Sequence, residues 1–281
     1  MNLGDCLLGL YEKALPFSLN WDEKLGMVKA LGYDFLEFSI DGDHTERLDW
    51  SEEEISAFME ASTRAGVPIY SIALTANRKY PLGSKDKKIR DAGIAVLKKA
   101  IILAPKIGAS IVQIATYDVY GEEKGDAETD MLFLESLREC EPMAASSGTM
   151  LALETMDTPY ADSIELCKRI VDIIGSPWVQ IYADNGNIAA AGYDFTQEIF
   201  KGAVHVVAIH LKDAKPGIMR DIDYGTGIVD FDADLTALKQ AGFSGLFIAE
   251  MWGTDDPAYR EKAGAACRFL REKIKAADAV N

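Results

Sequence analysis

The segment Met150-Leu-Ala-Leu-Glu154 is a short apolar run that ends in one ionisable residue. The same pattern returns three times further along the chain, in Val179-Gln-Ile-Tyr-Ala-Asp184, Val206-Val-Ala-Ile-His210 and Leu246-Phe-Ile-Ala-Glu250. The four ionisable residues are 30, 26 and 40 positions apart, and longer helix-periodic stretches fill the intervals. Apolar strands that alternate with helices are typical of a parallel sheet.

The same alternation runs from one end of the 281 residues to the other. The predicted strands are Cys6–Leu10, Phe35–Ile40, Pro68–Leu74, Ile111–Thr116, Met150–Thr155, Val179–Asp184, Val206–Lys212 and Leu246–Met251. The predicted helices start near Trp21, Ser51, Asp86, Glu128, Asp162, Phe195, Asp232 and Asp256. Eight such units are the number that closes a (β/α)8 barrel. An open doubly wound sheet has fewer strands and a glycine-rich first turn, whereas residues 11–16 contain no glycine.

The ends of the predicted helices support this division. Ser51 and Glu54 have the spacing of a capping box. A glycine follows six of the helices shortly before the next strand, namely Gly32, Gly66, Gly108, Gly148, Gly175 and Gly242. No linker or low-complexity segment divides the chain. We therefore predict an α/β protein that forms a single TIM-barrel domain over residues 1–281.

The composition excludes several partners. The chain has 29 Lys+Arg against 45 Asp+Glu, a formal net charge of −16. Such a surface repels nucleic acid and anionic lipid, and a phosphorylated ligand would need a few placed cations. The four cysteines are far apart and form no zinc-binding or disulfide pattern. The sequence has neither a signal-peptide pattern nor a membrane-spanning apolar run. We expect a cytoplasmic enzyme without nucleic-acid or membrane partners.

The ends of the last four strands carry the candidate chemistry. In a TIM barrel the carboxyl ends of the strands meet at one mouth, so Glu154, Asp184, His210 and Glu250 are expected to converge there. Three carboxylates and one imidazole suit a divalent Mn, Mg, Co or Zn ion. Without a cation, the burial of three carboxylates would lower the stability of the fold by roughly several kcal/mol. We interpret His44 and His205 as structural or solvent-facing.

Two members of this set suit proton transfer on carbon. Glu154 and Glu250 come from the fifth and eighth strands, which lie on different sides of the mouth. One glutamate can remove a proton from a carbon beside a carbonyl while the other supplies a proton to the opposite face. A metal that holds the neighbouring oxygens would stabilise the enediolate between these steps. The expected outcome is epimerisation.

Two loops carry the cations of the presumed mouth. Tyr11, Glu12 and Lys13 follow the first strand, and Asn77 to Arg90 follow the third. Ser84 before a helix, with Lys13 and Arg90 nearby, has the features of an anion site. The alternative interpretation is a solvated loop with a helix cap. Residues 212–227 form a late loop that can cover the site, and Lys212 shares strand parity with His210, which predicts that it pairs with a ligand carboxylate.

The sequence resembles the L-ribulose-5-phosphate 3-epimerase (L-xylulose-5-phosphate 3-epimerase) family of the xylose isomerase-like barrels. The motifs that carry the resemblance are Gly-Leu-Tyr-Glu-Lys-Ala-Leu-Pro (9–16), Pro-Leu-Gly-Ser (81–84), Tyr-Asp-Val-Tyr (117–120), Glu-Thr-Met-Asp (154–157), Asp-Asn-Gly-Asn (184–187), His-Leu-Lys-Asp-Ala-Lys-Pro-Gly (210–217), Gly-Thr-Gly-Ile-Val-Asp-Phe (225–231) and Ala-Glu-Met-Trp (249–252).

The resemblance implies a role for each matching position. Glu154, Asp184, His210 and Glu250 would hold one divalent metal ion, and the two glutamates would act as acid and base. Lys13 and Ser84 would bind phosphate, with Arg90 beside them. The remaining candidates for substrate contact are Tyr11, Glu12, Asn77, Asp157, Asn187 and Lys212.

Two of these positions, Asn77 and Asn187, bear on the choice of substrate. From the resemblance we expect histidine at position 77 in close relatives, so Asn77 is a departure from the family pattern. Epimerases of unphosphorylated ketoses often have histidine near Asn187, so an asparagine there fits the phosphate-using branch. The resemblance also implies a homodimer and a place in the breakdown of ascorbate or pentoses.

The leading hypothesis is metal-dependent inversion at C3 between L-ribulose 5-phosphate and L-xylulose 5-phosphate. An epimerase or isomerase of an unphosphorylated ketose or polyol ketone is the second hypothesis, and a non-catalytic sugar-binding barrel is the third. A multi-zinc phosphodiester nuclease is disfavoured, because three histidines and a charge of −16 suit neither its metals nor DNA. Three oxygens and one nitrogen suit several divalent ions, so the sequence does not name the metal.

Overall fold

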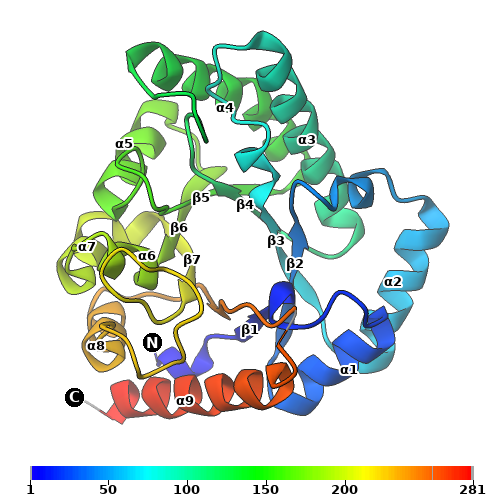
Figure 1. The fold of residues 1–281 in the computed structure, drawn as a ribbon, viewed down its shortest axis with the longest axis vertical. Helices are drawn as coiled ribbons and strands as arrows, with labels where there is room; N and C mark the ends of the chain where they lie inside the picture. The colour runs from blue at the N-terminus through cyan, green and yellow to red at the C-terminus, as the bar shows by residue number, and fades with distance from the viewer. Residues whose placement is uncertain (1, 255, 280–281) are drawn as a thin grey trace.

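The described part of the chain, residues 2–254 and 256–279 of the computed structural model, contains eight parallel strands that close into a barrel with helices around it (Figure 1). The strands are β1 (Leu8–Tyr11), β2 (Phe35–Ile40), β3 (Ile69–Leu74), β4 (Ile111–Ala115), β5 (Met150–Glu154), β6 (Val179–Asp184), β7 (Val206–Leu211) and β8 (Leu246–Ala249). Each strand pairs with the next in the chain, and β8 pairs with β1. The predicted TIM barrel is confirmed.

The strand ends differ slightly from the prediction. The prediction began the first strand at Cys6, but Cys6 follows a 3-10 helix, η1 (Leu3–Asp5), and β1 begins at Leu8 and includes Tyr11. Thr116, Thr155 and Lys212 were included in strands but lie just beyond them, because the chain leaves the sheet there to enter the loops of the barrel mouth. Glu250 also follows its strand, although its backbone N–H still donates to the Leu211 carbonyl at 3.1 Å.

The helices start within three residues of the predicted positions. They are α1 (Trp21–Leu31), α2 (Glu52–Ala65), α3 (Lys87–Lys106), α4 (Ala127–Ser147), α5 (Ile164–Ile174), α7 (Phe195–Gly202), α8 (Phe231–Gln240) and α9 (Tyr259–Ala279). The Ser51 capping box is present. The six predicted glycines have φ between +64° and +92°, the left-handed conformation that favours glycine after a helix. One short helix was not predicted, α6 (Asn185–Ala190), directly after β6.

Apolar side chains fill both the space between sheet and helices and much of the barrel interior. The interior also contains polar residues, including Glu37, Ser71 and Gln113, none of which is exposed. A buried polar group is costly unless it finds hydrogen-bond partners. These residues do have partners, since Ser71 donates a hydrogen bond to Glu37 and Gln113 donates one to Glu154. Among the described residues, all four cysteines are buried and free.

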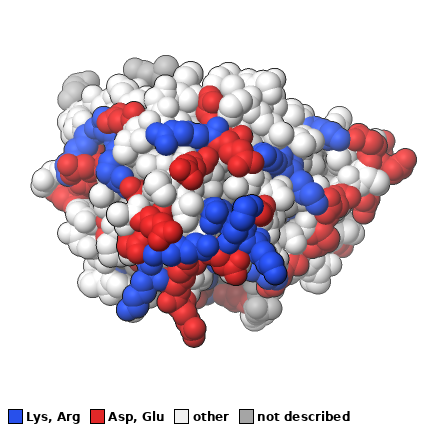
Figure 2. Space-filling model, turned by 90° about the horizontal axis from the view of Figure 1, so that it is seen from above, with Lys and Arg blue, Asp and Glu red and all other residues white. Residues whose placement is uncertain are grey.

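Charges of both signs share the surface. On the face in Figure 2, Lys and Arg side chains lie among Asp and Glu side chains rather than in a separate basic region. In the ranges that the structure describes, no helix combines the length and apolar character that crossing a membrane requires.

One buried acid on α8 gives the fold a testable pH dependence. Burial raises the pKa of Asp234 from 3.8 to about 7, although the side chain accepts a hydrogen bond from Asn185. The folded state then holds a proton that the unfolded state has lost, so stability falls as pH rises from about 4 to 7 and stays low above it.

Asp234→Asn is therefore expected to raise the free energy of unfolding at pH 8 by up to about 4 kcal/mol, since one pKa unit corresponds to about 1.4 kcal/mol. The gain at pH 4 should be small. Urea unfolding at both pH values measures it, and an equal effect at both would contradict the assignment of this acid.

Candidate metal and active site

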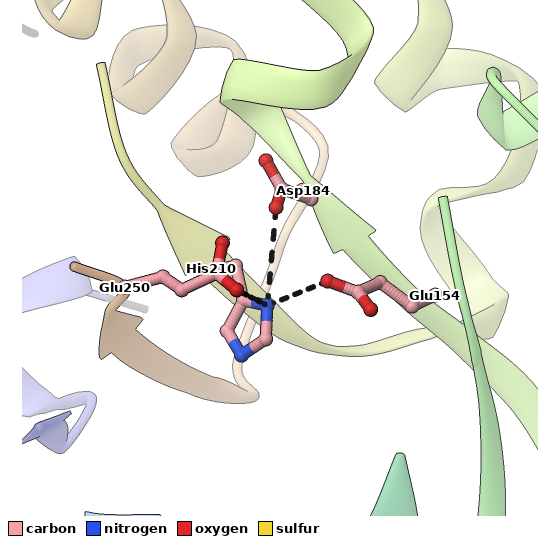
Figure 3. Close-up of side chains that lie close together, drawn as sticks. All are labelled: Glu154, Asp184, His210 and Glu250. Carbon is pink, nitrogen blue, oxygen red and sulfur yellow. Dashed lines mark hydrogen bonds and ion pairs between the residues drawn. The ribbon is translucent and has the colours of Figure 1, made fainter. Parts of the chain in front are cut away.

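Four predicted side chains meet at the barrel mouth. Glu154 and Asp184 are the last residues of β5 and β6, His210 lies near the end of β7, and Glu250 follows β8. Figure 3 shows Glu154 and Glu250 reaching the imidazole from opposite sides, with Asp184 between them. The Nδ1 atom of His210 lies 2.8 Å from Glu154 Oε1, 3.8 Å from Glu250 Oε1 and 3.9 Å from Asp184 Oδ2. All four side chains are buried.

The cluster concentrates negative charge. Burial is the main cause that raises the pKa of Asp184 to about 7. Lys212 opposes this rise, and the neighbouring Glu250 carboxylate adds to it. Burial also acts to raise the pKa of Glu250, but Lys212 and His210 outweigh burial and lower it to about 2. Burial acts to lower the pKa of His210, and Glu37 and Glu250 outweigh it and raise that pKa. Lys212 and His210 are thus the positive charges that offset the buried carboxylates of the site.

The donor set fits a divalent cation. One ligand atom from each of the four residues lies within 4.8 Å of the others, and within the described ranges this is the one such group of His, Cys, Asp or Glu. Three carboxylate oxygens and one imidazole nitrogen are donors that Mn, Mg, Co and Zn accept. An ion among them would also relieve the repulsion that raises the pKa of Asp184.

Two further predicted residues support the acids directly. Lys212 Nζ lies 2.7 Å from Asp184 Oδ2 and 2.6 Å from Glu250 Oε2, in the direction that strand parity predicted. Asn187 donates its backbone N–H to Asp184 Oδ1 at 2.8 Å and its side-chain amide to the Thr155 carbonyl at 2.8 Å. Lys212 therefore bridges Asp184 and Glu250, and Asn187 holds the other carboxylate oxygen of Asp184.

The first loop is only partly directed at the cluster. The Tyr11 ring lies 6.0 Å from the His210 ring and 6.2 Å from the Trp252 ring, between centroids. Glu12 instead lies in a buried ion cluster, 2.7 Å from both Lys24 and Arg47. Glu12, a predicted substrate contact, therefore uses its carboxylate to bind Lys24 and Arg47 and stabilises the loop in which it lies.

The predicted phosphate residues divide into two groups. Ser84 and Arg90 lie together, since Arg90 donates to the Ser84 carbonyl at 2.5 Å. The Ser84 hydroxyl and the Lys85 backbone N–H donate to the carboxylate of Glu123, at 2.7 and 2.8 Å. Lys13 instead pairs with Asp41 at 2.5 Å, and no described contact joins it to Ser84. Asp86 caps α3, as the alternative interpretation of this loop expected.

The loop after β3 leaves polar atoms without partners. Asn77 is buried, and neither atom of its side-chain amide has a hydrogen-bond partner among the described residues. Arg78 Nε is buried without a partner too, and the guanidinium lies 5.6 Å from the Tyr117 ring centroid. The Tyr117 hydroxyl donates to Asp157. Buried polar atoms of this kind are expected to meet a ligand or water.

The model of the xylose isomerase-like TIM barrel family matches residues 25–273 of this chain. The chain belongs to this family. It is 39% identical to "L-ribulose-5-phosphate 3-epimerase UlaE" of Shigella flexneri over 97% of this chain and 96% of that one. The protein of the same name from Escherichia fergusonii is 41% identical over 89% of each chain. Like these relatives, the chain is an enzyme of the isomerase class.

Solved structures with the same fold include sugar epimerases. One is "Structure of L-ribulose 3-epimerase", with a TM-score of 0.80 at 17% identity, covering 97% of this chain and 95% of that one. A D-psicose 3-epimerase from Clostridium cellulolyticum H10 has a TM-score of 0.81 at 16% identity, covering 95% and 99%. At these identities the likeness shows the shared fold.

This member of the xylose isomerase-like family has site residues that the sequence patterns did not single out. Glu37 lies inside the barrel and contacts His210, and Gln113 donates its side-chain amide to Glu154. Each lies within a buried strand that is mostly apolar, Glu37 in Phe35–Ile40 and Gln113 in Ile111–Ala115. A charged or amide residue within a fully buried strand was the available signal.

A cavity of about 960 Å³ opens beside the cluster. Lys212 and Glu250 form part of its wall. The other lining residues come from the loop after β7, yellow to orange in Figure 1, from the segment after β8 and from the first half of α9. Trp252 and Arg220 line it, with the guanidinium carbon 4.9 Å from the indole centroid. The volume lies in the range of small-molecule sites, so the late loop forms a wall of a ligand-sized space.

Proposed function

We propose that this enzyme interconverts L-ribulose 5-phosphate and L-xylulose 5-phosphate by inversion at C3. The observation that carries the proposal is the approach of Glu154 and Glu250 to one point from opposite sides. The names of the 39% and 41% identical relatives support the substrate.

The two glutamates divide the proton transfers. One carboxylate removes the C3 proton from its face of the ketose phosphate, and the other, in its protonated form, delivers a proton to the opposite face. Lys212 bridges Asp184 and Glu250 and so holds Glu250 in place. The surrounding burial keeps bulk water away from the carbon between the two carboxyl groups.

Glu154, Asp184, His210 and Glu250 would hold the divalent metal ion. When bound, such an ion acts as a Lewis acid that makes a proton beside a carbonyl more acidic.

Phosphate selection is assigned to the two loops that carry the cations. Lys13 supplies charge from the first loop, and Ser84 and Arg90 supply a hydroxyl and a second charge at the start of α3. In the free enzyme the carboxylate of Glu123 binds Ser84 and the carboxylate of Asp41 binds Lys13. The substrate phosphate, which is also an anion, would replace these carboxylates on Ser84 and Lys13.

The Lys13→Ala variant is expected to raise KM for the phosphorylated ketose by about 10- to 100-fold, the value of one lost charged hydrogen bond. Its kinetics with unphosphorylated L-ribulose should not change. Steady-state assays with both sugars measure this, and an equal loss on both would assign Lys13 to the fold of the loop instead.

Conversion of L-ribulose 5-phosphate, followed by ¹³C NMR, tests the proposed reaction. The expected result is an equilibrium mixture with L-xylulose 5-phosphate as the new species. The second candidate, an epimerase of unphosphorylated ketoses, is favoured by the fold neighbours that act on such sugars. Higher kcat/KM on L-ribulose than on its 5-phosphate would select that candidate and overturn the first.

The resemblance to these epimerases also suggests an oligomeric state and a pathway. We propose a cytoplasmic homodimer that acts in ascorbate breakdown. Light scattering of the purified protein would give twice the chain mass of 30.7 kDa for a dimer.

A further inference from the structure

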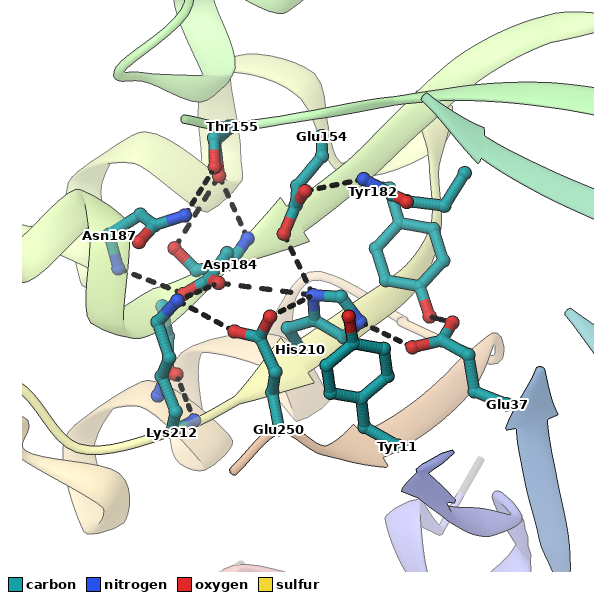
Figure 4. A network of polar contacts seen from close by, with 12 residues as sticks. Tyr11, Glu37, Glu154, Thr155, Tyr182, Asp184, Asn187, His210, Lys212 and Glu250 are labelled. Atoms are coloured by element: carbon teal, nitrogen blue, oxygen red, sulfur yellow. Dashed lines mark hydrogen bonds and ion pairs between the residues drawn. The ribbon is translucent and has the colours of Figure 1, made fainter. Parts of the chain in front are cut away.

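We propose that Glu37 is a positioning residue that fixes the orientation and the tautomer of His210, so that Nδ1 is the imidazole nitrogen left to bind the metal. The proposal rests on the metal site of the proposed function. It assigns a role to a buried acid that lies on the other side of the imidazole from Glu154, Asp184 and Glu250 (Figure 4).

The contacts of His210 distinguish its two nitrogens. Nε2 lies 2.7 Å from Glu37 Oε2, whereas Nδ1 is the atom nearest to the other three carboxylates. An ionised carboxylate only accepts hydrogen bonds. Nδ1 also faces a carboxylate, since it lies 2.8 Å from Glu154 Oε1. A cation held among Glu154, Asp184 and Glu250 would take the place of a proton on Nδ1, and the contact with Glu37 would keep the remaining imidazole proton on Nε2.

Glu37 is itself held rigidly. Its Oε1 atom accepts hydrogen bonds from the Ser71 hydroxyl at 2.8 Å and the Tyr182 hydroxyl at 2.6 Å. Its side chain is fully buried. Ser71 and Tyr182 come from β3 and β6, so two separate strands fix the carboxylate that fixes the imidazole. The Tyr182 ring also lies against His210, with centroids 4.7 Å apart.

With a metal ion bound, Glu37 and His210 would form the carboxylate–imidazole–metal relay that orients histidine ligands in many metalloproteins. Loss of such a partner typically lowers metal affinity by about 10- to 100-fold. A glutamine at position 37 carries no charge and offers one acceptor oxygen, so it cannot accept from both His210 and the two hydroxyls as the carboxylate does.

The chain is well suited to a direct test, because it has only three histidines, His44, His205 and His210. Selective ¹⁵N-histidine labelling and long-range ¹H–¹⁵N NMR of the Zn²⁺-loaded protein report which nitrogen of each ring carries a proton and which binds zinc. A chromogenic chelator in competition gives the zinc Kd without substrate. Glu198→Gln is the matched control, since Glu198 is a buried acid on α7 that pairs with Lys201.

The expected result for the unmodified enzyme is a proton on Nε2 and zinc on Nδ1 of His210. Glu37→Gln should weaken zinc binding by about 10- to 100-fold, Glu37→Asp should recover part of the loss, and Glu198→Gln should retain the original Kd. If Glu37→Gln fails to fold, Tyr182→Phe tests the same relay, because it removes one of the bonds that hold Glu37 and should weaken zinc binding to a smaller extent.

Zinc on Nε2 in the unmodified enzyme would overturn the proposal, and so would an unchanged zinc Kd and unchanged His210 signals in Glu37→Gln. These failures are distinct from failure of the proposed function. A zinc-loaded enzyme with the expected His210 signals but no turnover of ketose phosphates would refute the reaction and leave the role of Glu37 intact.

Discussion

Glu250→Gln is expected to lower kcat for epimerisation by about 10²- to 10⁴-fold, the range that a positioned general acid or base contributes. The amide keeps the size of the side chain and one oxygen for the metal, but it cannot take up or release the C3 proton. Glu154→Gln should cause a loss of similar size. Initial rates of L-xylulose 5-phosphate formation measure both.

The two variants should also differ from each other. Each retains one glutamate, so each should still exchange the C3 hydrogen of one epimer with solvent while forming little of the other epimer. Glu198→Gln, which neutralises a buried acid outside the site, controls for stability. If either Gln variant kept the activity of the unmodified enzyme, the two-glutamate mechanism would be refuted.

Removal of the divalent metal is expected to abolish turnover and to lower the melting temperature. Without the ion, Glu154, Asp184 and Glu250 repel one another in a buried site, and burial with this repulsion raises the pKa of Asp184. A bound ion at 100 times its Kd stabilises the folded state by about 2.7 kcal/mol. Activity assays and calorimetry after chelation, with Mn²⁺, Zn²⁺, Co²⁺ or Mg²⁺ added back, measure both effects.

His210→Ala provides the comparison. The variant should show the low melting temperature of the chelated enzyme and no rise when metal is added. A chelated enzyme that keeps full turnover would contradict the metal requirement. A melting temperature that rises with metal in both proteins would place the ion at another site.

The sequence predicted the barrel because its patterns are local. Each strand spans four to six mostly apolar residues in the structure. The predicted glycines, such as Gly66 and Gly148, follow their helices in the left-handed conformation. The missed helix α6 begins directly at the end of β6, where Asp184 caps it, so no turn signal separated the two elements.

The convergence of Glu154, Asp184, His210 and Glu250 was predictable for a related reason, since parallel strands bring their carboxyl ends together. The pairing of Lys212 with Asp184 and Glu250 followed from alternation along a strand. Both inferences need only the register of side chains along regular elements.

Contacts across the barrel were not accessible from local patterns. The contact between Glu37 and His210 joins residues 173 positions apart, and the pairing of Glu12 with Arg47 depends on how the loops after β1 and β2 fold over each other. The same holds for Glu123, which reaches Ser84 from the loop before α4. The first contact depends on how β2 and β7 face each other across the closed barrel, and the others depend on the packing of loops whose conformations the sequence leaves open.

The most direct test of two-glutamate inversion is the fate of hydrogen at C3 in deuterium oxide. L-ribulose 5-phosphate is converted by the enzyme to a small extent, and both sugars are recovered and examined by NMR. Two opposed glutamates predict solvent deuterium at C3 of the newly formed L-xylulose 5-phosphate, with little in the recovered substrate. Product that retains its original hydrogen at C3 would contradict the account.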